Sequence, residues 1–433
     1  MDQKKRTVGL LGAISIGIGG MVGGGIFAVL GEAVSLARGA TAVAFLFAGI
    51  VALLTAYSYS KLSVAYQNRG GTVVFVDNAF GHNLLSGSLN LLLWLSYLVT
   101  IALYAVAFAS YAGTFFHGMP RWGKHVLSTA AILLPAVINM LRASFVSRSE
   151  TAVVIIKLAL LILVIVAGAS FVDTARLSPA QWGSSFSIIV AGMIIFVAYE
   201  GFELIANASE DIRNPRSNLP RAFFGSTIAV VVLYALISVI TVGTVPGGQL
   251  LASKDYALAV AAKPSLGQAG FTMVSITAML ATFSAINATI YGNARLGYII
   301  AKEGELPALL DEERHDIPVA GVVLTSLLSM LIANLIDLAG IAIIGSAGVL
   351  LIFSLVNISA YRLRRGIGGN GAVLLAASVA SIAALAALLI HTYADNPREI
   401  SVFLSFIGIS VLFETVYGRF YRGHFFHRRY GDS

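Results

Sequence analysis

The stretch Gly17–Phe27, GIGGMVGGGIF, decides the fold expected for this chain, because six of its eleven residues are glycine. It lies inside a long apolar segment that begins near residue 8. Glycine in a helix costs about 1 kcal/mol relative to alanine, so the cluster favours a break at which the helix unwinds. Such a break leaves N–H groups uncovered, and the half-helix that follows attracts a carboxylate to its N-terminus. The alternative is close helix–helix packing, which small residues also mediate.

The composition of the chain places this segment in a lipid bilayer. Of its 433 residues, 58% are hydrophobic and 11% are charged, whereas a soluble domain carries about 25% charged residues. A helix needs about 20 mostly apolar residues to cross the hydrocarbon core. Twelve segments qualify, at residues 8–36, 41–66, 84–116, 125–141, 150–172, 185–207, 221–244, 267–298, 317–336, 338–361, 371–393 and 399–418. We therefore predict an all-α integral membrane protein with twelve transmembrane helices.

The distribution of basic residues predicts the orientation of the chain. The apolar run of the first segment continues past residue 30, so we expect a retained span and no cleaved signal peptide. With the N-terminus inside, the cytoplasmic connections carry 20 of the 28 Lys and Arg residues, and the outer connections carry seven. This asymmetry predicts a multi-pass protein of the cell membrane with cytoplasmic N- and C-termini. The basic stretch Arg419–Arg429 is expected to contact anionic lipid headgroups, and we expect no nucleic acid partner.

A second break is expected at Phe196–Glu203, FVAYEGFE, where two carboxylates and a glycine interrupt an apolar segment. An ionisable group inside a membrane costs about 2.5 kcal/mol or more and by default marks a functional site. The alternative for Glu200 and Glu203 is a structural hydrogen bond to a neighbouring helix. The two breaks fall in the first and sixth segments, which is the spacing of a five-plus-five inverted repeat with a binding site near the midplane.

Four motifs, in this order, carry a resemblance to a known family: Gly23–Phe27, Tyr57–Leu62, Ala198–Glu203 and Asn287–Gly292. Further matches lie at Gly70–Gly71, Ala79–Gly81, Glu210–Pro215, Pro220–Ala222 and Gly304–Pro307. The chain resembles the amino acid–polyamine–organocation transporters, and its proton-coupled amino acid transporters in particular. The resemblance implies a LeuT-like fold, with a ten-helix transport core over residues 1–361 and inverted repeats at about 8–172 and 185–361. Residues 362–433 would form two peripheral helices and a basic cytoplasmic tail.

The resemblance also implies a binding site for an amino acid or a related amine between the two breaks. The substrate carboxylate would meet N–H groups of the first break, and the substrate ammonium would meet freed carbonyl groups of both breaks. The residues implied are Met21, Gly23, Gly24, Gly25, Val197, Ala198, Tyr199 and Glu200. Glu200 stands where the family usually has an apolar residue. It either pairs with a cationic substrate or acts as a second proton site.

Lys157 is expected to replace a coupling ion. Sodium-coupled relatives of this fold bind Na⁺ between spans 1 and 8, close to span 5, and Lys157 in span 5 resembles the lysine that takes this place in proton-coupled relatives. Its neighbours would be Ser284 and the backbone of Gly17–Gly20. A buried amine releases its proton readily, so Lys157 could gain and lose a proton during the cycle. The alternative is that Lys157 snorkels to the membrane interface.

These residues predict secondary active transport by alternating access, coupled to protons and independent of sodium, with exchange of substrates as the alternative. A channel or a membrane sensor is less favoured, because no repeated ring of charges or carbonyl motifs is present. The chain has no cysteine and its seven histidines are scattered, so we expect neither a metal nor a cofactor. No catalytic constellation suggests an enzyme. Membrane lipids are expected partners, and no obligate protein partner is expected.

Overall fold

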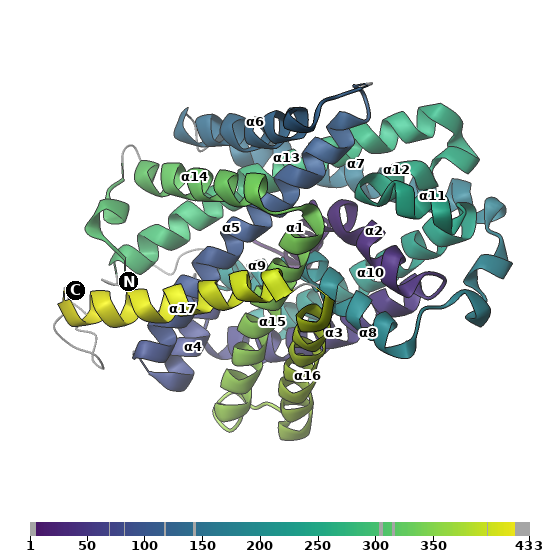
Figure 1. Cartoon of the computed structure of the whole chain (residues 1–433). Helices are drawn as coiled ribbons and strands as arrows, with labels where there is room; N and C mark the ends of the chain where they lie inside the picture. The colour runs from purple at the N-terminus through teal and green to yellow at the C-terminus, as the bar shows by residue number, and fades with distance from the viewer. Residues whose placement is uncertain are drawn as a thin grey trace.

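The computed structural model describes residues 6–68, 70–81, 83–116, 118–141, 144–302, 306–313, 317–395 and 397–420. Over these residues the chain is helical, and its extended pairing is limited to two isolated bridges, Val8 with Ile212 and Arg38 with Trp182. The long helices pack against one another in one bundle (Figure 1). The basic tail predicted to contact lipid lies almost entirely outside the described residues.

Ten helices of the described residues are long and apolar enough to cross a membrane. They are α3 (Thr41–Ala65), α5 (Leu84–Gly113), α6 (Arg121–Leu141), α7 (Ser144–Gly168), the segment Ser185–Asn207, α10 (Pro215–Thr244), α13 (Lys263–Lys302), α15 (Leu338–Arg362), α16 (Gly371–Asp395) and α17 (Pro397–Phe420). The bent pair α1 (Leu10–Met21) and α2 (Gly25–Ala37) is an eleventh candidate. The remaining predicted span is α14 (Val319–Leu335), an apolar helix of 17 residues. At 1.5 Å per residue it covers about 25 Å, which is less than the usual hydrocarbon thickness.

The break predicted in the first span is present. Helix α1 ends at Met21, helix α2 begins at Gly25, and the two are bent by 52°. The alternative explanation for the glycines also applies, because the backbone approaches its neighbours closely here. A Cβ atom on Gly25 would lie 2.8 Å from Cα of Ala198, and one on Gly24 would meet the ring of Tyr104. The glycine cluster therefore both interrupts the helix and permits close packing.

The break predicted in the sixth span is present as well. Helix α8 (Ser185–Ile194) passes into the 3-10 helix η4 (Ile195–Tyr199). Glu200 then has an extended backbone, Gly201 has a φ of 123°, and the short helix α9 (Leu204–Asn207) follows. Because a φ in this range is open to glycine and strained for other residues, Gly201 allows the chain to change direction at this point.

The two breaks lie directly against each other. A Cβ atom on Gly201 would overlap the backbone of Gly20 and Met21, so only glycine fits here. The hydroxyl of Tyr234, on α10, donates to the carbonyl oxygen of Met21 at 2.7 Å and also lies 3.3 Å from the carbonyl oxygen of Ala198. Tyr234 is fully buried. One side chain from a continuous helix therefore joins the first break to the second.

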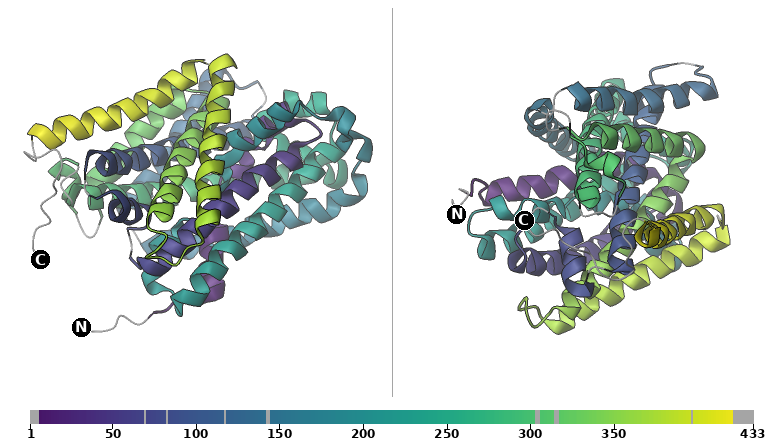
Figure 2. Two further views of the ribbon diagram at one scale, coloured as in Figure 1. Left: turned by 90° about the horizontal axis from the view of Figure 1, so that it is seen from below. Right: turned by 90° about the vertical axis from the view of Figure 1, so that its left-hand side faces the viewer.

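The last two helices lie at the edge of the bundle. Helix α17 runs along one side and packs on α5, α15 and α16 (Figures 1 and 2). Helix α16 packs on α3, α8 and α15. Three further short α-helices are α4 (Thr72–Phe80), α11 (Gly247–Ala252) and α12 (Ala257–Ala261). The division into two inverted repeats and a peripheral pair stays a prediction.

Candidate functional site

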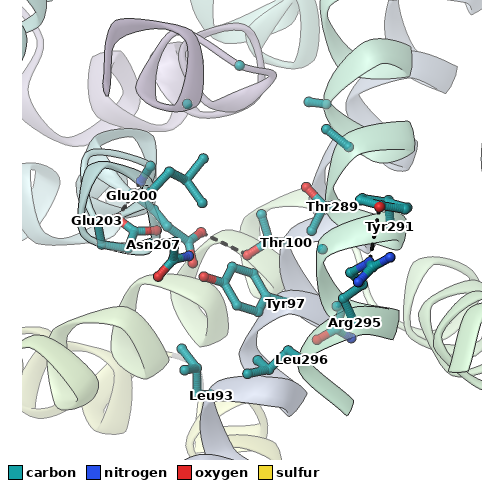
Figure 3. A pocket seen from close by; sticks show the side chains of 18 of the residues that line it. Leu93, Tyr97, Thr100, Glu200, Glu203, Asn207, Thr289, Tyr291, Arg295 and Leu296 are labelled. Atoms are coloured by element: carbon teal, nitrogen blue, oxygen red, sulfur yellow. Dashed lines mark hydrogen bonds between the residues drawn. The ribbon is translucent and has the colours of Figure 1, made fainter. Parts of the chain in front are cut away.

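A cavity of about 640 Å³ lies beside the two breaks. Its walls come from the broken first span, from the second break and α9, and from α5, α7 and α13 (Figure 3). Four of the predicted substrate-binding and proton-coupling residues line it together: Gly23, Lys157, Glu200 and Ser284. The other lining side chains include Tyr97, Thr100, Tyr104, Glu203, Asn207, Thr289, Tyr291 and Arg295.

The cavity extends toward the end of the bundle where the described chain begins. Its lining includes Gly70 and the first residues of α4, Leu93 near the start of α5, and Ile299 near the end of α13. Arg6 lies at the same end, because its guanidinium donates to the side chain of Gln67 at 2.7 Å. The orientation predicted from the basic residues would make this the cytoplasmic side.

The opposite end is closed over α2. The segment that contains α11 and α12 packs there, and Lys254 forms an ion pair with Glu32 of α2, with 2.8 Å between Nζ and Oε1. Burial lowers the pKa of Lys254, but its hydrogen bond to Glu32 and the nearby negative charges raise it above the ordinary 10.5. Beneath this segment, Tyr111 donates a hydrogen bond to the carbonyl of Phe27 at 3.2 Å. A separate cavity of about 1120 Å³ lies on this side and is lined by Ser110, among others.

Both glutamates of the second break line the cavity and are almost fully buried. Oε2 of Glu200 accepts a hydrogen bond of 2.9 Å from the hydroxyl of Thr100, on α5. Oε2 of Glu203 accepts one of 2.7 Å from the backbone N–H of Gly201, so this carboxylate caps the break in its own segment. In the part of the chain that the structure describes, neither carboxylate forms an ion pair with Lys, Arg or His.

Lys157 reaches from α7 to the end of α1. Its amine donates to the carbonyl oxygen of Gly19 at 3.2 Å, and the side chain is only 3% exposed. The amine therefore points into the protein, which is not the snorkelling arrangement. Gly19 lies in the last turn of α1, where carbonyl groups have no partner within the helix and a positive charge is favoured. Ser284, on α13, lines the same cavity.

The other six predicted substrate residues lie behind the cavity wall in this conformation: Met21, Gly24, Gly25, Val197, Ala198 and Tyr199. Several of their polar groups have partners inside the protein. Two of their carbonyl groups accept from Tyr234. The N–H of Val197 donates to the hydroxyl of Ser346 at 3.0 Å, and the hydroxyl of Tyr199 donates to the carbonyl of Phe45 at 2.9 Å.

The wall that α5 contributes was not predicted. Tyr97, Thr100 and Tyr104 line the cavity from this helix, at spacings of three and four residues. This spacing places them on one helical face, and polar groups on one face of a long apolar helix are a signal that was present in the sequence. Thr289 and Arg295 of α13 lie across from Glu200 and Glu203 (Figure 3).

The arrangement defines a class of protein. Two interrupted helices meet beside a cavity inside a helical membrane bundle, and this cavity is closed over at one end of the bundle, as in membrane transporters built around broken helices. A family model described as amino acid permease matches residues 8–413, which is nearly the whole chain. The chain therefore belongs to this amino acid permease family and is a multi-pass membrane transporter, not an enzyme.

Individual relatives agree with this assignment. An uncharacterized protein of Methanocaldococcus jannaschii is 34% identical, with all of both chains covered. The inner membrane transport protein YbaT of Escherichia coli is 33% identical over 96% of this chain and 98% of its own. The branched-chain amino acid permease BcaP of Bacillus subtilis is 25% identical over 83% of this chain and 81% of its own.

Proposed function

We propose that this amino acid transporter is driven by protons, is independent of sodium, and works by alternating access in the cell membrane. The observation that carries the proposal is the contact of the Lys157 amine with the carbonyl of Gly19. This contact puts a titratable cation at the end of the broken helix, beside the cavity. Membership of an amino acid permease family supports amino acids as the substrates.

The amine of Lys157 would take the place of the bound Na⁺ of sodium-coupled transporters. While protonated, it donates to a terminal carbonyl of α1 and holds this half-helix against α7. When it loses its proton, the charge and a donor disappear together, and the favourable interaction with the negative end of α1 is lost. Movement of α1 would then open or close the cavity at the end that Gly70 and Ile299 line.

The substrate is expected to bind at the first break. Helix α2 begins after Gly24 with no side-chain cap on its first N–H groups. These donors and the positive end of the helix suit the carboxylate that all amino acids share. Gly23 already lines the cavity, while Gly24 and Gly25 lie just behind it. We propose that backbone groups of the residues behind the wall come into contact with the substrate as the cavity contracts around it.

Uptake into proteoliposomes tests the proposal. Radiolabelled amino acids are offered with and without an inward proton gradient, and with Na⁺ or K⁺ outside at a clamped membrane potential. In the wild type, we expect accumulation to depend on the proton gradient and to be the same with Na⁺ or K⁺ outside. In Lys157→Ala, we expect accumulation to be lost. Lys61→Ala is the matched control, because Lys61 lies on α3 outside the cavity. A requirement for Na⁺ would refute sodium independence, and counterflow that ignores the proton gradient would indicate an exchanger.

A further inference from the structure

Glu200 is a buried carboxylate that faces the cavity without a cationic partner among the described residues. Its side chain is 7% exposed, and it accepts one hydrogen bond, from Thr100. A carboxylate can accept about four hydrogen bonds, so Glu200 can accept further hydrogen bonds beside the one from Thr100. Burial of a charge is costly unless a partner compensates it. A ligand that enters the cavity can supply this partner.

The surroundings of Glu200 make this wall of the cavity negative. Glu203 lies three residues away on the same wall, and its carboxylate is turned to the N–H of Gly201 (Figure 3). Among the described residues, two basic side chains line the cavity, and both are on other elements. Lys157 donates to the carbonyl of Gly19, and Arg295 donates to the hydroxyl of Tyr291 at 3.0 Å on α13.

We propose that Glu200 binds a cationic group at the end of the substrate's side chain, and that the preferred substrates are basic amino acids such as lysine or arginine. This inference rests on the proposed function of the chain as an amino acid transporter. The substrate carboxylate would lie at the first break and its side-chain cation at Glu200, both within the cavity beside the two breaks. Thr100 is a positioning residue, because its hydroxyl fixes one oxygen of Glu200 and leaves the other free for the cation.

The alternative role for Glu200 is to carry a proton, and the two roles differ in what they predict. A group that pairs with the substrate sets the order in which substrates are preferred. A group that only carries a proton changes the pH profile and leaves that order unchanged. Norleucine has the carbon chain of lysine without the terminal ammonium, so these two ligands isolate the contribution of the charge.

The test is equilibrium binding of radiolabelled lysine and norleucine to the purified protein at one fixed pH. Hydrogen bonds to charged groups in a buried site change affinity by about 10- to 100-fold. We therefore expect the wild type to bind lysine at least about tenfold more tightly than norleucine. Glu200→Gln keeps an acceptor for Thr100. It should still bind norleucine, and its affinities for lysine and norleucine should become similar. Thr100→Val should weaken the binding of lysine several-fold and leave the binding of norleucine unchanged.

Glu414→Gln is the matched control, because Glu414 is equally buried but lies on α17, outside the cavity. It should keep the preference of the wild type. Equal binding of lysine and norleucine by the wild type would overturn the inference, and so would a Glu200→Gln protein that retains the wild-type preference for lysine. If neither amino acid binds the wild type and no other amino acid does, the proposed function itself fails.

Discussion

Replacement of Tyr234 by phenylalanine tests whether the two breaks work as one unit. The Tyr234 hydroxyl donates to the carbonyl of Met21 in the first break and lies near the carbonyl of Ala198 in the second. The ring packs against Phe45 and Tyr199, with centroid distances of 5.7 Å and 5.4 Å. Tyr234→Phe keeps this packing and removes only the hydroxyl, so the effect reports on the link between the breaks.

The expected magnitude follows from the burial of both acceptors. A buried carbonyl that loses its donor costs about 1–3 kcal/mol. The hydroxyl of Tyr234 has one proton for its two acceptors, so we count this cost once. At 1.4 kcal/mol for each factor of ten, the aligned arrangement of the breaks becomes about 5- to 150-fold less favoured. The apparent affinity for a substrate that needs both breaks falls by up to this factor.

The assay measures the dissociation constant for a transported amino acid and the thermal unfolding temperature of the purified protein. Tyr199→Phe is the control, because the hydroxyl of Tyr199 donates to the carbonyl of Phe45 on α3. We expect both variants to unfold at a lower temperature, and only Tyr234→Phe to lose affinity. Wild-type affinity in Tyr234→Phe, or an equal loss in both variants, would refute the role assigned to this link.

Three further predictions concern the breaks and the closed end. Gly201→Ala places a Cβ atom on a residue with a φ of 123° and against the backbone of the first break, so we expect a strain of about 1–3 kcal/mol and loss of transport. Gly408→Ala, on α17 with open space around it and outside the cavity, should behave as wild type in uptake assays. Glu32→Gln removes the partly exposed ion pair with Lys254, which stabilises the closed end by up to about 1 kcal/mol. A cysteine introduced at Ser110, which lines the cavity on this side, should therefore react with an impermeant thiol reagent up to about fivefold faster. An unchanged rate would refute a gating role. The labelling rate of either protein rises with pH because the thiolate is the reactive form of cysteine. Since the pKa of Lys254 is raised, the pair is lost only as the pH rises above 10.5, so the ratio of the rates in Glu32→Gln and in the wild type should be constant between about pH 6 and 9.

The sequence predicted the two breaks because their causes are local. Six glycines in Gly17–Phe27, and the glutamates on either side of Gly201, disfavour a continuous apolar helix whatever the helix packs against. The role of Lys157 was predicted from the family resemblance, which implied an internal partner on the first span, whereas the local pattern left snorkelling open. The structure supplies this partner at the carbonyl of Gly19.

The cavity wall was harder to predict because it depends on how separate helices pack. Tyr97, Thr100 and Tyr104 belong to a continuous helix, and nothing local shows which face of α5 meets the breaks. The same holds for Tyr234, whose hydroxyl satisfies the carbonyl of Met21, which the resemblance had assigned to the substrate. Which backbone groups remain open to a ligand is a property of the packed conformation.

The most direct test of the central claim is a measurement of proton movement during transport. Proteoliposomes that contain a pH-sensitive dye in their lumen receive an amino acid from outside, with no sodium present and the membrane potential clamped. Proton-coupled transport through Lys157 predicts that the amino acid acidifies the lumen in the wild type and in Lys61→Ala, and that it does not in Lys157→Ala. Uptake of amino acid without acidification in the wild type, or undiminished acidification in Lys157→Ala, would contradict it.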